Sequence, residues 1–514
     1  MSLVQKNSIV AAPGTVPRAV DSELLPAALI SPKRFLVVLA ALFALHIVIR
    51  LITSPVADLD ESEQLVFTQS FAWGYGPQPP LYTWLQVAFF RVFGPSLFAL
   101  SLLKNILIFG IYAFTYAAAR RLARSHFVGV IAALALMFIP QIVWESQRDL
   151  THSVLATTFA AATLYVFAQL ADGGRRAVFY PLLGACFGLG MLSNYNYALL
   201  AVGLVVGAVF VKEFRALVLT PWMLLSIAIG LVIILPHWLW AREHVPVVLA
   251  SIRKMRIRST ATVISITSAS IHNLVWAWLT HVMSIIIVFA VLCWKQLVPF
   301  PRAAFRRAPA MLMLAIVTAA LAGVAFMMIG KHATAFKGRW LQPIYVCLPM
   351  FFALLVEPRL NRSVLRQITF LAGTVTLIVI VLLPARIWYA EPLHRDEPLR
   401  APLPELTSML KQSVAQSDFI VTSDFFLGGN FRLSFPQKKV FTPEFNPSPL
   451  RQNGSSCLII YNATEDLQPP PAFHKFLAGE IGSDAASIEW SFIQTRSGAT
   501  SKALRLAYAR VVLK

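Results

Sequence analysis

Four acidic side chains fall within the six-residue segment DLDESE, which follows an apolar run ending near Thr53. Only ten acidic residues occur in all between residues 24 and 390. A carboxylate that is close to other carboxylates, or partly removed from water, holds its proton more readily and is a better base near neutral pH. The segment is therefore a candidate general base or electrostatic stabiliser. Its acidic members are Asp58, Asp60, Glu61 and Glu63.

Two basic stretches supply the opposite charge. The stretch GKHATAFKGRW (330–340) contains Arg339, whose planar guanidinium can bind a phosphate in a bidentate way. Lys331, His332 and Lys337 in the same stretch are weaker candidates for an anion ligand. The stretch ASIRKMRIRST (250–260) can bind an anionic ligand or merely contact anionic lipid.

The composition indicates a polytopic membrane protein. The 514 residues are 57% hydrophobic and 13% charged, whereas a soluble protein carries about 25% charged residues. The net charge of +20 is typical of basic cytoplasmic loops, so we expect membrane lipid and no nucleic acid as partners. About eleven spans are predicted, at 35–53, 97–119, 127–144, 151–171, 177–193, 195–211, 221–240, 271–292, 308–330, 340–356 and 367–388.

The N-terminal 33 residues are rich in Pro and Ala and are predicted to be disordered and cytoplasmic. They do not form a signal peptide, because the first apolar run begins only after Lys33 and Arg34. The four cysteines show neither a disulfide framework nor the spacing of zinc ligands.

Basic residues predict the orientation in the membrane. If Lys33 and Arg34 are cytoplasmic, five alternate loops must be cytoplasmic too, and all five are basic: 119–125, 172–176, 212–215, 295–307 and 357–366. The acidic loop 54–96 and the C-terminus then face outward. The alternative role for the acidic residues of this loop is to help the loop to be translocated. Acidic residues, however, contribute little to orientation.

The composition changes near Ala390. Twelve acidic residues occur in the last 124, with prolines and short alternating runs. DFIVTSDFF, SSCLIIYNA and KALRLAYARVVL are predicted strands, and PELTSMLKQSVAQ is a predicted helix. We therefore expect an all-α transmembrane domain over 34–390 and a small, soluble α/β domain over 391–514 on the periplasmic face.

The acidic loop carries a wider pattern. Asp60-Glu61 is followed by WGY from Trp73, PPL from Pro79, Trp84 and FGPS from Phe93. In this combination the chain resembles the bacterial protein O-mannosyltransferase-like glycosyltransferases, which include the lipid A aminoarabinose transferase. These are type C glycosyltransferases. The resemblance covers residues 35–390, including LGACFGLGMLSNYNY (183–197) and GRWLQPIYVCLP (338–349).

The resemblance implies a reaction. An acceptor hydroxyl or amine attacks the anomeric carbon of a sugar, and a polyprenyl phosphate leaves, usually with inversion. Asp60 matches the catalytic aspartate of the family, and adjacent Glu61 orients groups or shares the role. The implied donor is a polyprenyl-phosphate sugar, and the implied acceptor is lipid A, a core sugar or another envelope glycan. A protein acceptor is the weaker choice. The implied location is the bacterial inner membrane.

The second outer loop, PQIVWESQRDLTHSVL, departs from the family pattern. Many relatives have a second aspartate there, but His152 occupies that place by register and Asp149 lies three residues earlier. On a helix, residues three apart share a face, so Asp149 and His152 could reach the same point. Arg148 is adjacent to Asp149. His152 could equally cap the helix or bond between helices. The departure leaves a divalent metal possible but not established.

Aromatic residues surround the acidic cluster. Trp73, Tyr75 and Trp84 are either interfacial anchors or substrate contacts. Residues 80–93 are too short to span a membrane and predict an amphipathic helix in the interface.

Two other classes of function stay open from the sequence. A transporter or lipid flippase could use the acidic loop to bind protons or cations, but transporters usually bury ionisable groups at the midplane and contain repeats. No repeat is recognisable here. The third class is a non-catalytic assembly partner that acts through its C-terminal domain.

Overall fold

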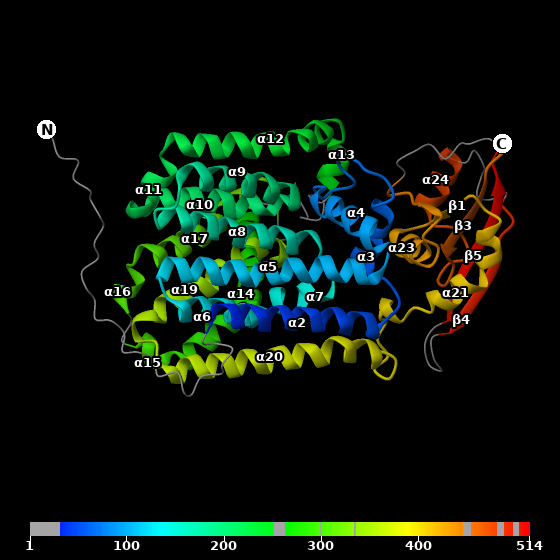
Figure 1. The fold of residues 1–514 in the computed structure, drawn as a ribbon. Coiled ribbons are helices and arrows are strands. Elements are labelled where there is room, and N and C mark those ends of the chain that lie inside the picture. The colour runs from blue at the N-terminus through cyan, green and yellow to red at the C-terminus, as the bar shows by residue number, and fades with distance from the viewer. Residues whose placement is uncertain are drawn as a thin grey trace.

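The computed structural model describes residues 31–250, 263–298, 301–333, 336–445, 454–480, 488–496 and 503–513. The predictions for residues 1–30 and for the basic stretch 251–260 fall outside these ranges. Long helices form a bundle, and the residues from 391 onward form a C-terminal unit at one end of it (Figure 1). Helices α3 (Leu59–Phe67) and α4 (Leu81–Phe93) lie at that same end, whereas α11 (Lys212–Val218) and α16 (Arg302–Phe305) lie at the opposite end.

Eight helices of the described residues are long and apolar enough to cross a membrane. Each contains an apolar run of the length that a bilayer core requires. They are α2 (Pro32–Thr53), α5 (Leu97–Ala123), α8 (His152–Ala171), α9 (Arg176–Ser193), α12 (Pro221–Glu243), α14 (Val263–Leu292), α17 (Ala308–Gly330) and α20 (Arg362–Trp388).

Two further predicted spans are broken helices. His126–Phe138 and Gln141–Arg148 meet at an angle of 78°, and Gly338–Tyr345 meets Cys347–Arg359 at 47°. Pro140 lies in the first break, where its missing N–H and its ring prevent a straight helix. These pairs contain α6 (His126–Ala135), η2 (Leu136–Phe138), η3 (Gln141–Glu145), α7 (Ser146–Arg148), η6 (Gly338–Leu341), α18 (Gln342–Tyr345), α19 (Cys347–Val356) and η7 (Glu357–Arg359).

The predicted count of eleven spans is not confirmed. The described residues contain eight, or up to ten if each bent pair is one span. The remaining prediction, 195–211, corresponds to the shorter apolar helix Tyr195–Phe210, made of η4 (Tyr195–Tyr197) and α10 (Ala198–Phe210). At a rise of about 1.5 Å per residue it falls short of the roughly 30 Å apolar core. The other short elements before the C-terminal unit are α13 (Val245–Val248) and α15 (Trp294–Leu297).

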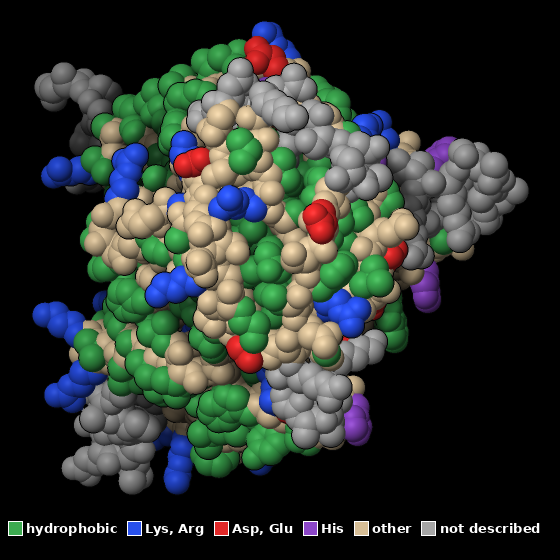
Figure 2. Space-filling view, turned by 90° about the vertical axis from the view of Figure 1, so that its right-hand side faces the viewer, with side chains coloured by type: hydrophobic (Ala, Val, Ile, Leu, Met, Phe, Trp, Pro, Cys, Tyr) green, Lys and Arg blue, Asp and Glu red, His purple; other side chains and the backbone are tan. Residues whose placement is uncertain are grey.

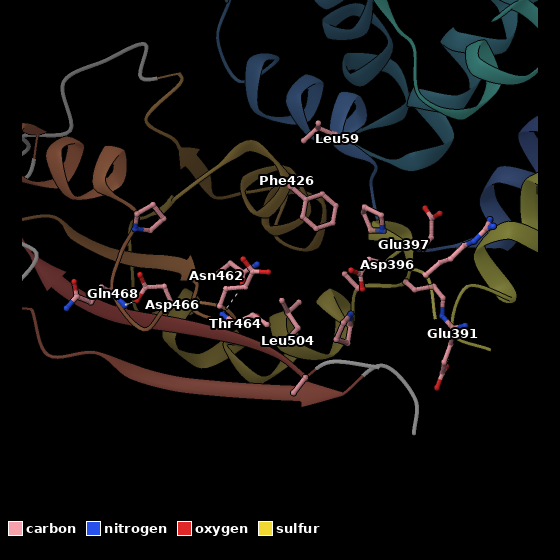
Figure 3. A pocket seen from close by; sticks show the side chains of 18 residues that line it. Leu59, Glu391, Asp396, Glu397, Phe426, Asn462, Thr464, Asp466, Gln468 and Leu504 are labelled. Carbon is pink, nitrogen blue, oxygen red and sulfur yellow. Dashed lines mark hydrogen bonds and ion pairs between the residues drawn. The ribbon is translucent and has the colours of Figure 1, made fainter. Parts of the chain in front are cut away.

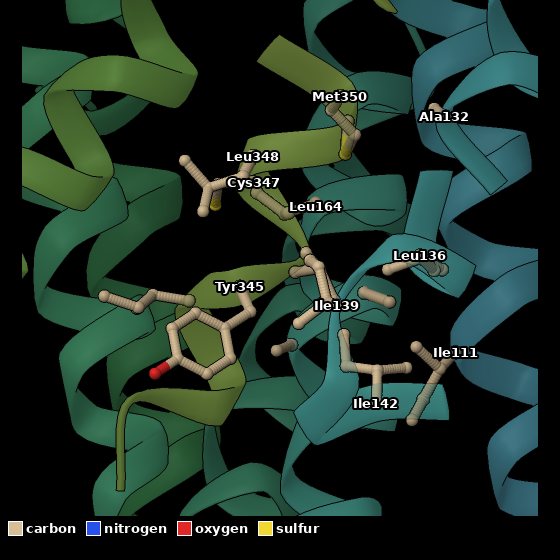
Figure 4. Close-up of a cluster of buried hydrophobic side chains, with 14 of the residues drawn as sticks. Ile111, Ala132, Leu136, Ile139, Ile142, Leu164, Tyr345, Cys347, Leu348 and Met350 are labelled. Carbon is tan, nitrogen blue, oxygen red and sulfur yellow. The ribbon is translucent and has the colours of Figure 1, made fainter. Parts of the chain in front are cut away.

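The centre of the bundle is a dry apolar core. Ile111 of α5, Leu164 of α8 and Tyr345 of α18 meet Ile139 and Ile142 around the first broken helix, and all five are buried (Figure 4). Since lipid is as apolar as these side chains, close packing holds such helices together. Small residues let α9 and α12 pack closely. There, a Cβ on Gly184 would lie 2.5 Å from the carbonyl oxygen of Ser226.

The C-terminal unit contains a mixed five-stranded sheet in the order β2-β1-β3-β5-β4. Strand β1 pairs in parallel with β2 and β3, while β5 is antiparallel to β3 and β4. The three predicted strands are confirmed as β1, β3 and β5; β2 and β4 were not predicted. The strands are β1 (Phe419–Thr422), β2 (Lys439–Phe441), β3 (Ser456–Asn462), β4 (Ser491–Arg496) and β5 (Ala503–Val512).

Helices cover both faces of this sheet. Leu406 of α21 and Leu427 of α23 pack with Ile420 on one face, whereas Phe473 of α24 packs with Val421 on the other. Seen from this end, acidic and basic side chains are interspersed over the surface (Figure 2). The predicted helix over 404–416 appears as two short helices. The non-strand elements are η8 (Pro398–Arg400), α21 (Leu403–Met409), α22 (Lys411–Ala415), α23 (Phe425–Ser434) and α24 (Pro471–Glu480).

Candidate active site

The acidic segment folds into helix α3 directly after α2. Asp58 is its N-cap residue and accepts a hydrogen bond from the backbone N–H of Leu59. The Glu61 carboxylate accepts from the backbone N–H of Asp58 at 3.0 Å, which completes a capping box. The cluster is therefore part of an ordered helix start, in which Asp58 and Glu61 have local structural partners.

Glu61 is held in an ion pair with Arg50 of α2. The guanidinium donates to both carboxylate oxygens, at 3.1 and 2.5 Å. It also donates to the carbonyl oxygens of Ser54 and Val56, so it closes the turn between α2 and α3. Burial is the largest single influence and opposes ionisation of Glu61. The charge and hydrogen bonds of Arg50, together with the Lys104 charge and the Asp58 N–H, outweigh burial and lower the pKa of Glu61 to about 2.

Asp60 has the opposite electrostatic environment. Burial is the largest influence and, with the negative charge of Asp149, raises the pKa of Asp60 to about 7, against the opposing influence of Lys104. The Thr151 hydroxyl donates to the Asp60 carboxylate at 3.2 Å. Asp60 is thus a carboxylate that can both accept and release a proton near neutral pH.

The second outer loop lies against α3. Asp149 follows α7, and its charge acts on both Asp58 and Asp60. His152 begins α8, and its Nε2 lies 3.4 Å from the side-chain nitrogen of Gln64 on α3. Both candidates therefore reach α3. Asp149 acts on the acidic end of the helix, whereas His152 lies one turn further along, against Gln64.

Lys104 is the buried cation of the site. It belongs to α5, only 4% of it is exposed, and its charge acts on Asp58, Asp60 and Glu61. Lys104 was not among the candidate residues identified from the sequence. Its signal was a lysine in an otherwise apolar run, and the tertiary structure alone places it beneath the acidic cluster.

Two of the three aromatic candidates around α3 form hydrogen bonds within the fold. The Tyr75 hydroxyl donates to the Ser70 carbonyl and accepts from the Ala72 N–H, both at 3.1 Å. Trp84 donates to the Ala72 carbonyl at 2.8 Å. Trp73 is 47% exposed and remains accessible to a ligand. Tyr75 and Trp84 therefore hold the turn after α3.

The stretch that contains Arg339 is hydrogen-bonded to the second outer loop. Gln342 donates to the Ser146 hydroxyl at 3.0 Å and accepts from the Gln141 side chain at 3.2 Å. Arg339 lies in η6, three residues earlier, is half-buried and forms no ion pair with any described residue. Lys331, Lys337 and His332 are exposed.

Arg148 points away from this stretch. It pairs with Glu145 at 3.0 Å and lines a small cavity together with Arg50 and Arg386. Its side chain is 38% exposed. Among the candidates of the second outer loop, Arg148 thus lies on the side of α2 and α20.

Comparison with known proteins decides the family. Two lipopolysaccharide core galacturonosyltransferases of Rhizobium johnstonii are similar over most of their length. RgtB is 30% identical over a match that covers 87% of this chain and 91% of RgtB. RgtA is 32% identical over a match that covers 80% of this chain and 82% of RgtA. A family model described as dolichyl-phosphate-mannose-protein mannosyltransferase matches residues 77–240.

The chain belongs to this family of membrane glycosyltransferases.

The fold of this glycosyltransferase agrees with that assignment. ArnT from Cupriavidus metallidurans, in a crystal structure bound to undecaprenyl phosphate, superimposes with a TM-score of 0.59 and 14% sequence identity. The match covers 93% of this chain and 98% of ArnT. The predicted fold class and resemblance to type C glycosyltransferases are confirmed. The transporter and assembly-partner alternatives are not supported.

In the part of the chain that the structure describes, no group of three or more His, Cys, Asp or Glu residues could hold a metal ion. The buried cation near Asp60 is instead a side chain, Lys104.

Proposed function

We propose that this glycosyltransferase moves a sugar from a polyprenyl-phosphate donor to a glycolipid acceptor of the lipopolysaccharide core type, on the periplasmic side of the inner membrane. The names of the relatives support the acceptor class. The lipid phosphate bound to ArnT supports the donor class. The observation that carries the proposal is the environment of Asp60, the acid of the cluster whose pKa is raised to about 7.

Asp60 is the proposed general base. In the reaction, an acceptor hydroxyl oxygen forms a bond to the anomeric carbon while the bond from that carbon to the phosphate oxygen breaks. The hydroxyl proton passes to the Asp60 carboxylate, and the electron pair of the broken bond leaves with the lipid phosphate. The carboxylate is aligned by the Thr151 hydroxyl, so it is oriented before substrate arrives.

Glu61 is proposed to position the base. Its carboxylate is occupied by Arg50 and by the helix cap, and its lowered pKa makes it a poor proton acceptor. This assigns different roles to two adjacent acids, because their surroundings move their pKa values in opposite directions.

The departing phosphate needs positive charge. Arg339 is the proposed ligand, because its guanidinium is not in an ion pair with any described residue and its segment is bonded to the second outer loop. Exposed Lys331, His332 and Lys337 lie in the same segment and are secondary candidates. Lys104 is proposed to balance the acids rather than to bind donor.

The test is sugar transfer in proteoliposomes, with undecaprenyl-phosphate galacturonic acid as donor and lipopolysaccharide as acceptor. Asp60→Asn keeps the size of the side chain and deletes the base. Turnover should fall by about 10²- to 10⁴-fold, the usual contribution of general-base catalysis. Glu63→Gln at matched expression is the control and should transfer normally.

Two outcomes would count against the proposal. Normal turnover by Asp60→Asn, with collapse for Asp149→Asn or His152→Ala, would move the base to the second outer loop. No transfer by the wild type from any polyprenyl-phosphate sugar would remove the proposed donor class.

A further inference from the structure

A large cleft lies in the C-terminal unit, between its sheet and the segment 391–402 that follows α20. Its volume is about 780 Å³, within the range of roughly 300–1,000 Å³ that is usual for ligand sites. Leu59 of α3 lies above it and Phe426 of α23 faces into it, while Asn462, Thr464 and Leu504 come from the sheet side (Figure 3). Neither Asp60 nor Lys104 lines it, so it is separate from the reacting groups.

The lining combines apolar faces with neutral hydrogen-bonding groups. Phe426, Leu504 and Leu59 offer apolar surface, and Asn462 and Gln468 carry side-chain amides at the rim. Amides both donate and accept hydrogen bonds. A sugar ring has an apolar face of C–H groups and a rim of hydroxyls, so this lining matches a saccharide better than an acyl chain.

The charges of the cleft favour an uncharged saccharide. Arg400 is paired with Glu391 at 2.7 Å, which neutralises both. Glu397 is paired with Arg386 at 3.4 Å. The other charged lining residues are one cation, Arg395, and three acids, Asp396, Glu465 and Asp466, so the lining is net negative. Ionised carboxylates only accept hydrogen bonds, which suits the hydroxyls of a sugar, and they repel phosphate or carboxylate groups.

The cleft lies beside the ends of α2 and α20. A second cavity, of about 300 Å³, shares Arg400 and Ala401 with it and runs along the ends of α2 and α20 past Thr53 and Trp388. Trp388 is 51% exposed, and tryptophan at the end of a spanning helix is typical of the membrane–water interface. A lipid held beside α2 and α20 could therefore extend its headgroup into the cleft.

The same cavities lead toward the reacting groups. A third, small cavity adjoins the second at Thr53 and Ile387 and is lined by Arg50 and Arg148. Arg148 is the neighbour of Asp149, whose charge acts on Asp60. On the other side, Leu59 in the cleft directly precedes Asp60. A glycan in the cleft would thus contact Leu59, the residue that precedes the proposed base, without occupying the position of Asp60.

We propose that this cleft binds an uncharged saccharide segment of the glycolipid acceptor, and that the lipid reaches it past the ends of α2 and α20. That this saccharide belongs to the acceptor rests on the proposed function, whereas the binding of a saccharide in the cleft does not. The cleft thereby selects the acceptor by its sugar chain, while Asp60 acts on one hydroxyl beside it.

Binding is tested on the full chain in detergent, with the lipid-free core oligosaccharide of lipopolysaccharide as the probe. Asp396 and Glu465 are exposed, so the double variant Asp396→Ala/Glu465→Ala should fold. It should weaken binding by about three- to tenfold. Phe426→Ala should weaken binding by about as much through loss of the apolar face. Glu489→Ala, an exposed acid of the same unit outside the cleft, is the control.

Equal affinity in the wild type and the double variant overturns the inference, and so does the absence of binding by the wild type at millimolar probe. In the transfer assay, the same variants should raise the KM for intact glycolipid and leave kcat unchanged. The two proposals fail separately. Normal transfer by Asp60→Asn with weakened binding by the cleft variants refutes only the base, whereas the reverse pattern refutes only the cleft.

Discussion

The Arg50 guanidinium and the Glu61 carboxylate form a two-pronged ion pair that joins α2 to the first turn of α3. The pair lies one residue away from Asp60, and only 17% of the Arg50 side chain and 5% of the Glu61 side chain are exposed. It explains how the fold keeps one acid of the cluster permanently ionised while its neighbour keeps an affinity for a proton.

Breaking this ion pair should destabilise the fold. Glu61→Gln leaves a buried guanidinium without its counter-charge, which costs about 3–5 kcal/mol. The double variant Arg50→Met/Glu61→Met should lose less than Glu61→Gln alone, because no buried charge remains. Thermal unfolding in detergent measures both. The more exposed pair of Arg307 and Glu357 is the control: Glu357→Gln should cost less than about 1 kcal/mol.

The pH dependence of transfer should report the proton affinity of Asp60. Its raised pKa predicts that kcat/KM increases as the pH rises through about 7, because only the ionised carboxylate can accept the proton. Asp149→Asn removes a negative neighbour, so the midpoint should move to lower pH. Lys104→Met removes a positive neighbour, so the midpoint should move to higher pH.

A variant of a distant acid serves as a control, because it removes a charge without acting on the pKa of Asp60. Asp172 pairs with Arg121 and Arg124, outside the environment of Asp60, and Asp172→Asn should leave the midpoint unchanged. A pH profile that is the same in Asp149→Asn as in the wild type would show that Asp60 is not the titrating base.

Asn430 of the C-terminal unit should position α3. Its side chain accepts from the Ala57 N–H at 2.8 Å and donates to the Ala57 carbonyl and the Ser62 hydroxyl at 3.1 and 3.2 Å. Asn430→Ala leaves these buried groups unpaired, which costs about 1–3 kcal/mol. We expect kcat to fall about tenfold, since small misplacements of catalytic groups are costly, while the donor KM stays close to normal.

Two comparisons test whether Asn430 acts by positioning α3. Asn430→Asp keeps the acceptor for the Ala57 N–H and should recover part of kcat. The exposed amide Gln412, on α22, is the control for a change in the same unit. A loss of donor affinity without a change in kcat would argue against a positioning role.

Arg339 should contribute most to donor binding among the cations of its segment. Arg339→Ala removes the bidentate fork and should raise the donor KM by at least tenfold, the effect of a charge-assisted hydrogen bond of about 1.5–3 kcal/mol. Arg339→Lys should rescue only part, because an ammonium binds as a point charge. Steady-state transfer at varied donor measures this. A larger effect of Lys331→Ala would place the phosphate nearer the end of α17.

Reporter fusions test the orientation of the chain. Fusions at Arg124, Arg215 and Arg366 should be cytoplasmic, and fusions at Gln69 and Ser417 should be periplasmic, because the basic loops hold their side of the membrane. A cytoplasmic signal at Ser417 would reverse the assignment of the C-terminal unit and, with it, of the acidic cluster.

Much of the fold could be predicted from local patterns. The long apolar runs predicted the spanning helices, and short alternating runs predicted β1, β3 and β5. The count of spans could not be predicted, since hydropathy does not distinguish a straight helix from one broken at Pro140. The short strand β2 and the edge strand β4 were missed, because each is defined mainly by its pairing with a neighbour.

The sequence by itself determined which residues could act: a carboxylate cluster after the first span, a second acid near α8, and an arginine before α18. Only the family resemblance favoured Asp60 over Glu61 as the base, because the two acids are adjacent and alike in chemistry. The tertiary structure decided the surroundings of each acid, by bringing Arg50 to the Glu61 carboxylate and the charge of Asp149 close to Asp60. The physical reason is that a proton affinity depends on burial and on charges a few ångströms away, and the distances between those groups exist only in the folded chain.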